Sequence, residues 1–231
     1  MTRTKSTCLA LIAVLLSPMA AHADPILSRS DLQTLLGGPG AVEDFESFVL
    51  GGGGVGFGCD TGDVFDATST CNGQGPGLVD SNLRLLKDPE GGFQMDSAGY
   101  FGATSNEFLI GAPADQPLII DFLSGVGAFG LDLRAFSGFA AVAQLIVYGL
   151  DDSTVLGLIS DIVLGSDGIS VFAGWSDISG IGSFSLTQTG QLWSPIVDNI
   201  EWGAVSVPEP GTLALFGIGL FGMGLSRRKK V

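Results

Sequence analysis

Carboxyl groups are the most abundant chemically active side chains in this sequence. Residues 24–207 contain 23 of the 24 aspartates and glutamates of the 231-residue chain. Two carboxyl groups at a set separation are enough for glycoside hydrolysis, in which one acts as the acid and the other as the base or nucleophile. Because no pair stands out by its spacing, we expect a non-catalytic protein, with a glycan-active hydrolase that uses paired carboxylates as the alternative.

One short acidic segment copies a catalytic tripeptide. Asp60-Thr61-Gly62 has the sequence found in aspartic proteases, which need two such aspartates that share one proton. Here the tripeptide occurs once and follows no apolar strand. Asp60, Asp63 and Asp66 also lack the spacing and the glycine position of an EF-hand calcium loop. The segment therefore favours a polar turn over either kind of site.

Other catalytic side chains are scarce. The single histidine, His22, lies outside residues 24–207, which leaves no imidazole there for a serine-type triad or a zinc site. The glycine-rich stretch 51–58 lacks the lysine of a phosphate-binding loop and is expected to be a flexible loop. Residues 24–207 hold 4 basic and 23 acidic side chains, a net charge of −19, so nucleic acid is excluded as a partner.

The first 23 residues have the layout of a secretory signal peptide. A basic start, Arg3 and Lys5, precedes the nine-residue apolar run 8–16, and the small residues Ala21 and Ala23 predict cleavage before Asp24. The alternative is a membrane anchor, but nine residues rise only about 14 Å as a helix, less than half of a bilayer core. Export through the inner membrane follows, with signal peptidase as the processing enzyme.

Export places two cysteines in an oxidising compartment. Cys59 and Cys71 bracket a single segment, and Cys8 belongs to the signal peptide. We expect a Cys59–Cys71 disulfide, with two free thiols as the alternative.

The last 25 residues form a three-part tail. A rigid turn, Pro208-Glu209-Pro210, is followed by the apolar stretch 211–225 and by Arg227, Arg228, Lys229 and Lys230. Fifteen residues give roughly 22 Å of helix, which is short for a membrane span and suits a segment held by another membrane protein. The basic cluster stays on the cytoplasmic side, so the acidic domain must lie outside.

This tail resembles a PEP-CTERM sorting signal in all three parts and in their order. The resemblance implies that an exosortase, a membrane protein with a cysteine-protease-like site, recognises the motif and cleaves near it. It also implies a Gram-negative bacterium that makes extracellular polysaccharide, and a product on the cell surface or in the matrix. The alternative is a plain C-terminal anchor with a proline-containing stalk.

Between the two ends, strand-like runs separated by turn residues predict one β-rich domain, residues 24–207, followed by the tail at 208–231. A short helix is expected first, capped by Ser30 and presenting Leu32, Leu35 and Leu36 on one face until glycine 37 stops it. Alternation predicts half-buried strands around 129–134 and 181–187. No helical period persists beyond residue 40, which favours an antiparallel β-sandwich of jelly-roll type. The expected strands are 42–50, 78–86, 106–110, 118–123, 128–136, 142–150, 155–159, 169–172, 181–187 and 196–202.

The domain also resembles, more loosely, jelly-roll carbohydrate-binding modules. The similarity lies in an opening Glu43-Asp44-Phe45-Glu46 strand and a closing Val197-Asp198-Asn199-Ile200 strand. In those modules the two strands lie close together and hold a structural calcium, which implies Asp44, Glu46 and Asp198 as ligands. The alternative is that these acids are ordinary solvated side chains.

Three tryptophans complete the candidate binding residues. Trp175, Trp193 and Trp202 are available to stack on sugar rings, although core positions are the commoner use of such residues. We therefore expect an exported cell-surface or matrix protein whose non-catalytic domain binds glycan, such as extracellular polysaccharide, or protein. A purely structural matrix subunit is a further alternative.

Overall fold

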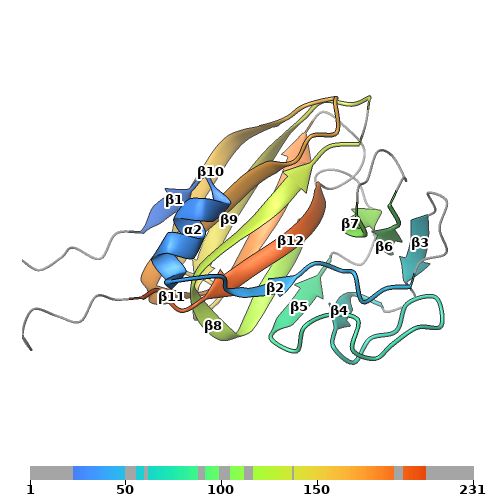
Figure 1. The fold of residues 1–231 in the computed structure, drawn as a ribbon, viewed down its shortest axis with the longest axis horizontal. Coiled ribbons are helices and arrows are strands. Elements are labelled where there is room, and N and C mark those ends of the chain that lie inside the picture. Colours follow the sequence, from blue (N-terminus) through green and yellow to red (C-terminus); the bar gives the residue numbers. More distant parts are fainter. Residues whose placement is uncertain are drawn as a thin grey trace, which may run out of the picture. The chain divides into compact units, whose positions relative to one another are not determined.

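The structure is a computed structural model that describes residues 23–49, 56–59, 62–87, 92–98, 105–111, 117–136, 138–189 and 195–206. The contacts of the chain group His22–Val205 into one compact unit. Figure 1 shows this unit as an antiparallel β structure with one short helix, so the predicted all-β class is confirmed. The apolar helix expected within 208–231 lies outside the described residues, and none of the helices within them is long and apolar enough to cross a membrane.

Twelve strands in the described residues belong to one sheet, and every pairing is antiparallel. The main path runs β10-β9-β11-β8-β12-β7-β6-β3, while β1 joins β11, β2 joins β12, and β4 joins β8 through β5. The strands are β1 (Asp24–Ile26), β2 (Ala41–Glu43), β3 (Gly56–Cys59), β4 (Val64–Asp66), β5 (Leu83–Leu86), β6 (Gly92–Asp96), β7 (Glu107–Gly111), β8 (Leu118–Arg134), β9 (Ala141–Gly149), β10 (Val155–Leu164), β11 (Val171–Thr189) and β12 (Ile196–Gly203).

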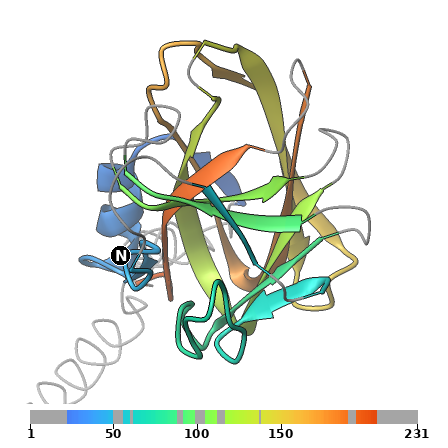
Figure 2. The same cartoon turned by 90° about the vertical axis from the view of Figure 1, so that its right-hand side faces the viewer.

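Two long strands fold this sheet onto itself. The first part of β8 pairs with β5 and with the end of β11, whereas its second part pairs with β12 and with the start of β11. A register shift between Ser176 and Ile181 marks the bend of β11, and Gly125 and Gly180 adopt φ values of 65° and 96° there. Glycine tolerates these values, so the strands can bend without ending. The result is a sandwich-like arrangement (Figures 1 and 2).

One continuous hydrophobic core fills the space inside the folded sheet. Phe129 and Phe184 stack at a ring separation of 4.4 Å where β8 and β11 pair. A second aromatic group lies nearer β6 and β7, where Phe108 contacts Phe45, Phe65 and Phe93 at 5.4–5.5 Å. Fully buried rings of this size contribute much of the hydrophobic stabilisation of a domain.

The predicted helix exists but begins two residues earlier than expected. Helix α2 (Arg29–Leu36) is capped by Ser28, whose hydroxyl accepts a bond from the Asp31 amide, rather than by Ser30. Gly37 ends the helix in a left-handed conformation, as predicted. Leu32 is fully buried, but Leu35 is exposed, so the apolar face is narrower than the sequence pattern suggests.

Several strand predictions need correction. The separate strands expected at 118–123 and 128–136 are one strand, β8, and those at 169–172 and 181–187 are joined in β11. Strand β3 begins at residue 56, inside the stretch 51–58 that was expected to be a loop. The two strands expected to be half-buried are covered on both faces, since Arg134, Ser183 and Ser185 are as buried as their apolar neighbours. The jelly-roll connectivity stays a prediction.

Candidate functional site

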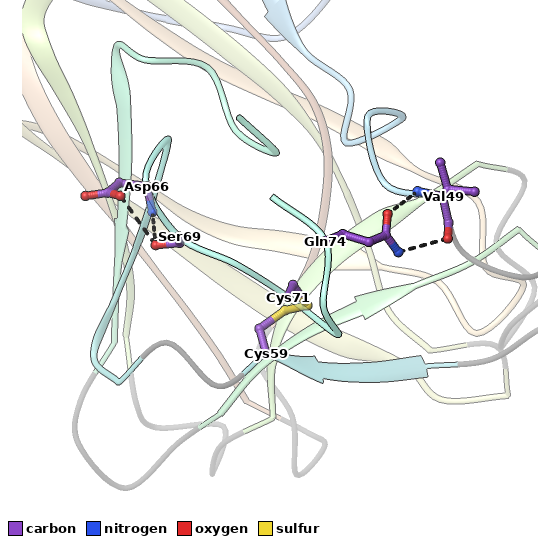
Figure 3. Close-up of a disulfide and its surroundings, with 6 residues drawn as sticks. All are labelled: Val49, Cys59, Asp66, Ser69, Cys71 and Gln74. Atoms are coloured by element: carbon purple, nitrogen blue, oxygen red, sulfur yellow. Dashed lines mark hydrogen bonds between the residues drawn. A yellow bond between two sulfur atoms is a disulfide. The ribbon is translucent and has the colours of Figure 1, made fainter. Parts of the chain in front are cut away.

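The predicted disulfide is confirmed. Cys59 at the end of β3 and Cys71 are bonded, with their Cα atoms 4.4 Å apart and both side chains buried (Figure 3). Cys71 and Gln74 exchange two backbone hydrogen bonds of 2.9 Å, and the Gln74 side chain bonds the Val49 backbone at 2.8 and 2.9 Å. The disulfide therefore anchors a turn that is also fixed to a distant part of the chain.

The acidic segment inside the disulfide loop forms a local turn. Asp66 accepts a bond from the Ser69 hydroxyl, while the Ser69 oxygen accepts the Asp66 amide (Figure 3). Asp66 also accepts the Thr68 hydroxyl at 2.7 Å. These bonds lower the pKa of Asp66, which faces solvent. Asp60 and Thr61 lie outside the described residues. The side chain of Asp66 thus stabilises the turn by accepting hydrogen bonds from Thr68 and Ser69.

The three residues predicted as calcium ligands bind separate protein partners. The strands that carry the two motifs do pair, through Glu43 and Ile200. Asp44 accepts the amide of Glu46, and Glu46 accepts the amide of Asn106 at 2.7 Å. Asp198 accepts the Ser105 hydroxyl at 2.6 Å.

No cluster of three or more His, Cys, Asp or Glu side chains suited to a metal ion occurs within the described ranges. The calcium site therefore stays a prediction. If calcium binds there, a chelator should lower the melting temperature of the protein.

Glu43 fixes the chain after β2 to the segment around Asp80. This buried carboxylate accepts the amides of Phe45 and Asp80 at 2.8 and 2.7 Å. Burial raises its pKa, and the two amide bonds oppose that rise. Glu43 belongs to the opening motif, but its bond to Asp80 was not predictable, because only the fold brings the two residues together.

A pocket of about 360 Å³ lies where β8 and β11 bend. Its charged lining is Arg84, Asp121 and Asp152, and exposed Leu123 and Leu150 supply apolar lining. We call this the bend pocket. Arg84 holds Asp121 through an Nε–Oδ2 bond of 2.9 Å. Burial raises the pKa of Asp121, while the bond and the charge of Arg84 oppose the rise.

The bend pocket lies at one end of an uncharged surface, the outer face. Its side chains come from three neighbouring strands. The strand register places them on the side of the sheet that faces away from the core. They are Val142, Gln144, Ile146 and Tyr148 of β9, Val155, Leu158 and Val163 of β10, and Ser183, Ser185, Thr187 and Thr189 of β11. None is charged, although the domain is strongly acidic.

Tyr148 is the aromatic residue among those named for the outer face, and the strand register places it close to the bend pocket. It pairs with Ser183, Ser183 pairs with Asp121, and Asp121 pairs with Arg84, so the four form one row across the sheet. Tyr148 and Asp121 are two strands apart, about 9–10 Å. The row combines an aromatic ring with hydroxyl, carboxylate and guanidinium groups.

A second pocket, the distal pocket, opens at the other end of the outer face. Its volume is about 390 Å³, and Gln144, Thr187 and Thr189 line it together with Ser160 and Asp161. Gln144 and Tyr148 are four residues apart on β9, about 13 Å along the strand. The two pockets therefore lie along the same strands.

The tryptophans do not form a sugar platform on the described surface. Trp175 and Trp202 are core residues with 6% and 4% of their surface exposed. Trp193 lies outside the described residues. Trp175 and Trp202 therefore pack in the core, which is the commoner use of tryptophan, and are not available to stack on sugars.

The processing residues fall mostly outside the described residues. This holds for Ala21, for Pro208, Glu209 and Pro210, and for the basic cluster at 227–230. Asp24, the predicted new N-terminus, pairs with Ser176 as the first residue of β1, and Ala23 before it is exposed and outside any strand. Cleavage before Asp24 would leave β1 intact.

Comparison with known proteins identifies the end of the chain. Residues 206–229 match the family model of the PEP-CTERM protein-sorting motif. No curated protein and no solved structure matches the chain. The chain therefore carries a C-terminal PEP-CTERM protein-sorting motif, which marks it as an exported protein of the cell envelope that exosortase processes.

Proposed function

We propose that the folded domain is a non-catalytic module that binds polysaccharide at the cell surface or in the extracellular matrix. The observation that supports it is the bend pocket, in which Arg84, Asp121 and Asp152 converge at one end of an uncharged face. Sorting by exosortase delivers such a module to the compartment where extracellular polysaccharide is found.

The chemistry of these groups suits sugars. Carboxylates accept hydrogen bonds from sugar hydroxyls, guanidinium donates to ring and hydroxyl oxygens, and an aromatic ring packs on the apolar face of a sugar. Among the polar side chains of the outer face, Gln144, Thr187 and Thr189 at the distal pocket are at least partly exposed, whereas Ser183 and Ser185 are buried. Because the domain carries a net charge of −19, the ligand is a neutral or amino-sugar polymer rather than an anionic one.

A glycan array probed with the protein tests this proposal first. We expect binding to neutral or amino-sugar polysaccharides, and a blank array would leave a structural matrix subunit as the better description. Calorimetry on the best ligand then compares Asp152→Asn and Tyr148→Ala with Asp167→Asn, an exposed acid that lies outside both pockets. Loss of a charged hydrogen bond predicts about tenfold weaker binding for Asp152→Asn and no change for the control.

The hydrolase alternative has one specific observation in its favour. Asp121 and Asp152 line the same pocket, and burial raises the pKa of Asp121, as an acid catalyst requires. Release of reducing ends from the bound polysaccharide tests it. If turnover occurs and either Asp121→Asn or Asp152→Asn abolishes it, the domain is an enzyme; binding without turnover supports the module.

A further inference from the structure

Four carboxylates lie side by side across four strands. Asp96 of β6 pairs with Glu107 of β7, and Asp198 of β12 pairs with Asp132 of β8. The pairing of Val197 with Phe108 places Glu107 and Asp198 next to each other, so the four acids form one row. We call it the carboxylate row. Their strand neighbours Met95, Phe108, Val197 and Leu133 belong to the core, so the row lies on the opposite face of the sheet.

Two arginines partly neutralise the carboxylate row. Arg134 pairs with Glu107, both side chains being buried, and Arg29 pairs with Asp132 at 3.1 Å. Residues 24–206 contain only two other basic residues, Arg84 and Lys87, which pair with Asp121 and Asp63. Like charges directly opposite each other on a sheet repel. The basic residues of this region therefore supply two cations for the four acids of the row.

Asp96 is the member of the row that most needs another positive charge. The residue is fully buried, and its Oδ1 atom accepts one bond, from Gln94 Nε2 at 2.7 Å. Its Oδ2 atom is buried and has no hydrogen-bond partner among the residues that the structure describes. A buried carboxylate oxygen without a partner is costly, whereas a protonated carboxyl carries no charge and can donate a bond.

The electrostatics agree with this geometry. Burial raises the pKa of Asp96 to about 6, and the charge of Glu107 adds to the rise, while the bond from Gln94 and the charge of Arg134 oppose it. The charged and titratable groups of the packed elements are Glu107 on β7, Arg134 and Asp132 on β8, Asp198 and Glu201 on β12, and Arg29 on α2.

The carboxylate row crosses a short joint in the sheet. Strand β7 pairs with β12 through a single residue pair in the described part of the chain, whereas β6 and β7 pair over five. The Glu107–Arg134 pair and the Ser105–Asp198 bond hold the same joint. Repulsion within the row therefore acts where few backbone bonds oppose it.

We infer that the Asp96 carboxyl is a proton-binding site that fastens the β6–β7 hairpin to β12. With the proton bound, the row has one charge fewer and the joint is closed. When the proton leaves, repulsion from Glu107 favours opening of the hairpin. A raised carboxyl pKa stabilises the folded form below it, so the joint tightens as the pH falls through about 6 and loosens as the pH rises.

Hydrogen exchange on the full-length chain tests this inference. A mild detergent is included because residues 211–225 are apolar. We expect the protection factors of Gly92–Asp96 and Glu107–Gly111, corrected for intrinsic exchange, to fall roughly tenfold between about pH 5 and about pH 8. Strand β9, which does not touch the joint in the pairing scheme, should change far less.

Two variants separate proton binding from a general charge effect. Asp96→Asn keeps the shape and removes the Asp96 titration, so the loss of hairpin protection between the two pH values should become much smaller, and Asp198, whose pKa is also raised to about 6, accounts for what remains. Asp167→Asn removes a charge from an exposed turn and should behave as the wild type. If Asp96→Asn does not fold, the wild-type pH profile decides alone.

Three results would overturn the inference. One is equal protection of the hairpin at both pH values in the wild type. Another is an undiminished pH dependence in folded Asp96→Asn. The third is restored protection on adding calcium at about pH 8, which would assign the row to a metal ion.

Discussion

Glu201 shows how a single buried side chain connects separate segments. Its carboxylate accepts bonds from Arg29 Nη1 at 2.7 Å, from Gln33 Nε2 at 3.2 Å and from the Gly40 amide at 2.9 Å. Burial raises its pKa, but these bonds together lower it below the ordinary value. Glu201 is therefore ionised at neutral pH and holds α2 against β12.

Removing this charge should weaken the domain. We expect Glu201→Gln to lower the free energy of unfolding by about 1–3 kcal/mol. Arg29 would lose a charged partner, and the NH2 group of the glutamine would lie opposite other hydrogen-bond donors. Chemical denaturation at neutral pH measures the change. Glu46→Gln is the matched control: Glu46 is exposed, and its glutamine oxygen can still accept the Asn106 amide. Equal losses in both variants would contradict this role of Glu201.

The functional residues show what a sequence reveals at this scale. Cys59 and Cys71 were predictable because they are near each other in the chain and the export signals set their redox state. Arg84, Asp121 and Asp152 were not, since they are far apart in the sequence and only strand register brings them to one pocket. Asp96 and Glu107 are close in the sequence, but β6 was not among the expected strands, so their pairing was not predictable either. Arg84 could have been singled out from the sequence, because it is one of only four basic residues in the acidic segment 24–207.

At the scale of elements, alternation identified most strands and misjudged their ends. The breaks near Ser124-Gly125 and Ser179-Gly180 have turn-like composition, but the chain uses them as bends within β8 and β11. Strand β3 was missed because glycine is depleted in strands, and here pairing with β6 and the disulfide hold it. Local composition therefore gave the fold class, while tertiary pairing determined the long strands.

A glycine in β10 offers a test of packing between strands. An added Cβ at Gly157 would lie 2.0 Å from the Trp175 ring, whereas at Gly149 the nearest atom is 3.6 Å away. Trp175 is buried in the core and has little room to move. We expect Gly157→Ala to destabilise the domain by about 1–3 kcal/mol and Gly149→Ala by less than about 1 kcal/mol, measured by urea denaturation. Equal stability of the two variants would refute this packing.

At the scale of the whole molecule, net charge and buried acids set the response to pH. Burial raises the pKa values of Asp96 and Asp198 to about 6, and such groups favour the folded state in their protonated form. Stability gained from them is present in acid and is lost as the pH rises through about 6. Glu201 acts in the opposite sense, because its lowered pKa makes the protein lose stability in stronger acid.

The protein should therefore be most stable in mild acid. We expect the free energy of unfolding to be about 2 kcal/mol greater near pH 5 than near pH 8, with a decline again below about pH 4. Denaturant titrations across this range measure it, and Asp96→Asn should remove about half of the decline above about pH 5, because Asp198 still titrates there. Stability that rises steadily from about pH 5 to about pH 8 would contradict the assignment of these buried acids.

Mass spectrometry of the mature protein tests the sorted, exported character of the chain most directly. We expect a product recovered from the cell envelope or the medium that begins at Asp24 and ends close to Pro208-Glu209-Pro210, without the apolar and basic tail. The same spectrum should show a mass 2 Da greater after reduction, from the Cys59–Cys71 bond. Recovery of the full chain from the cytosol, with Met1 and Val231 both present, would contradict the account.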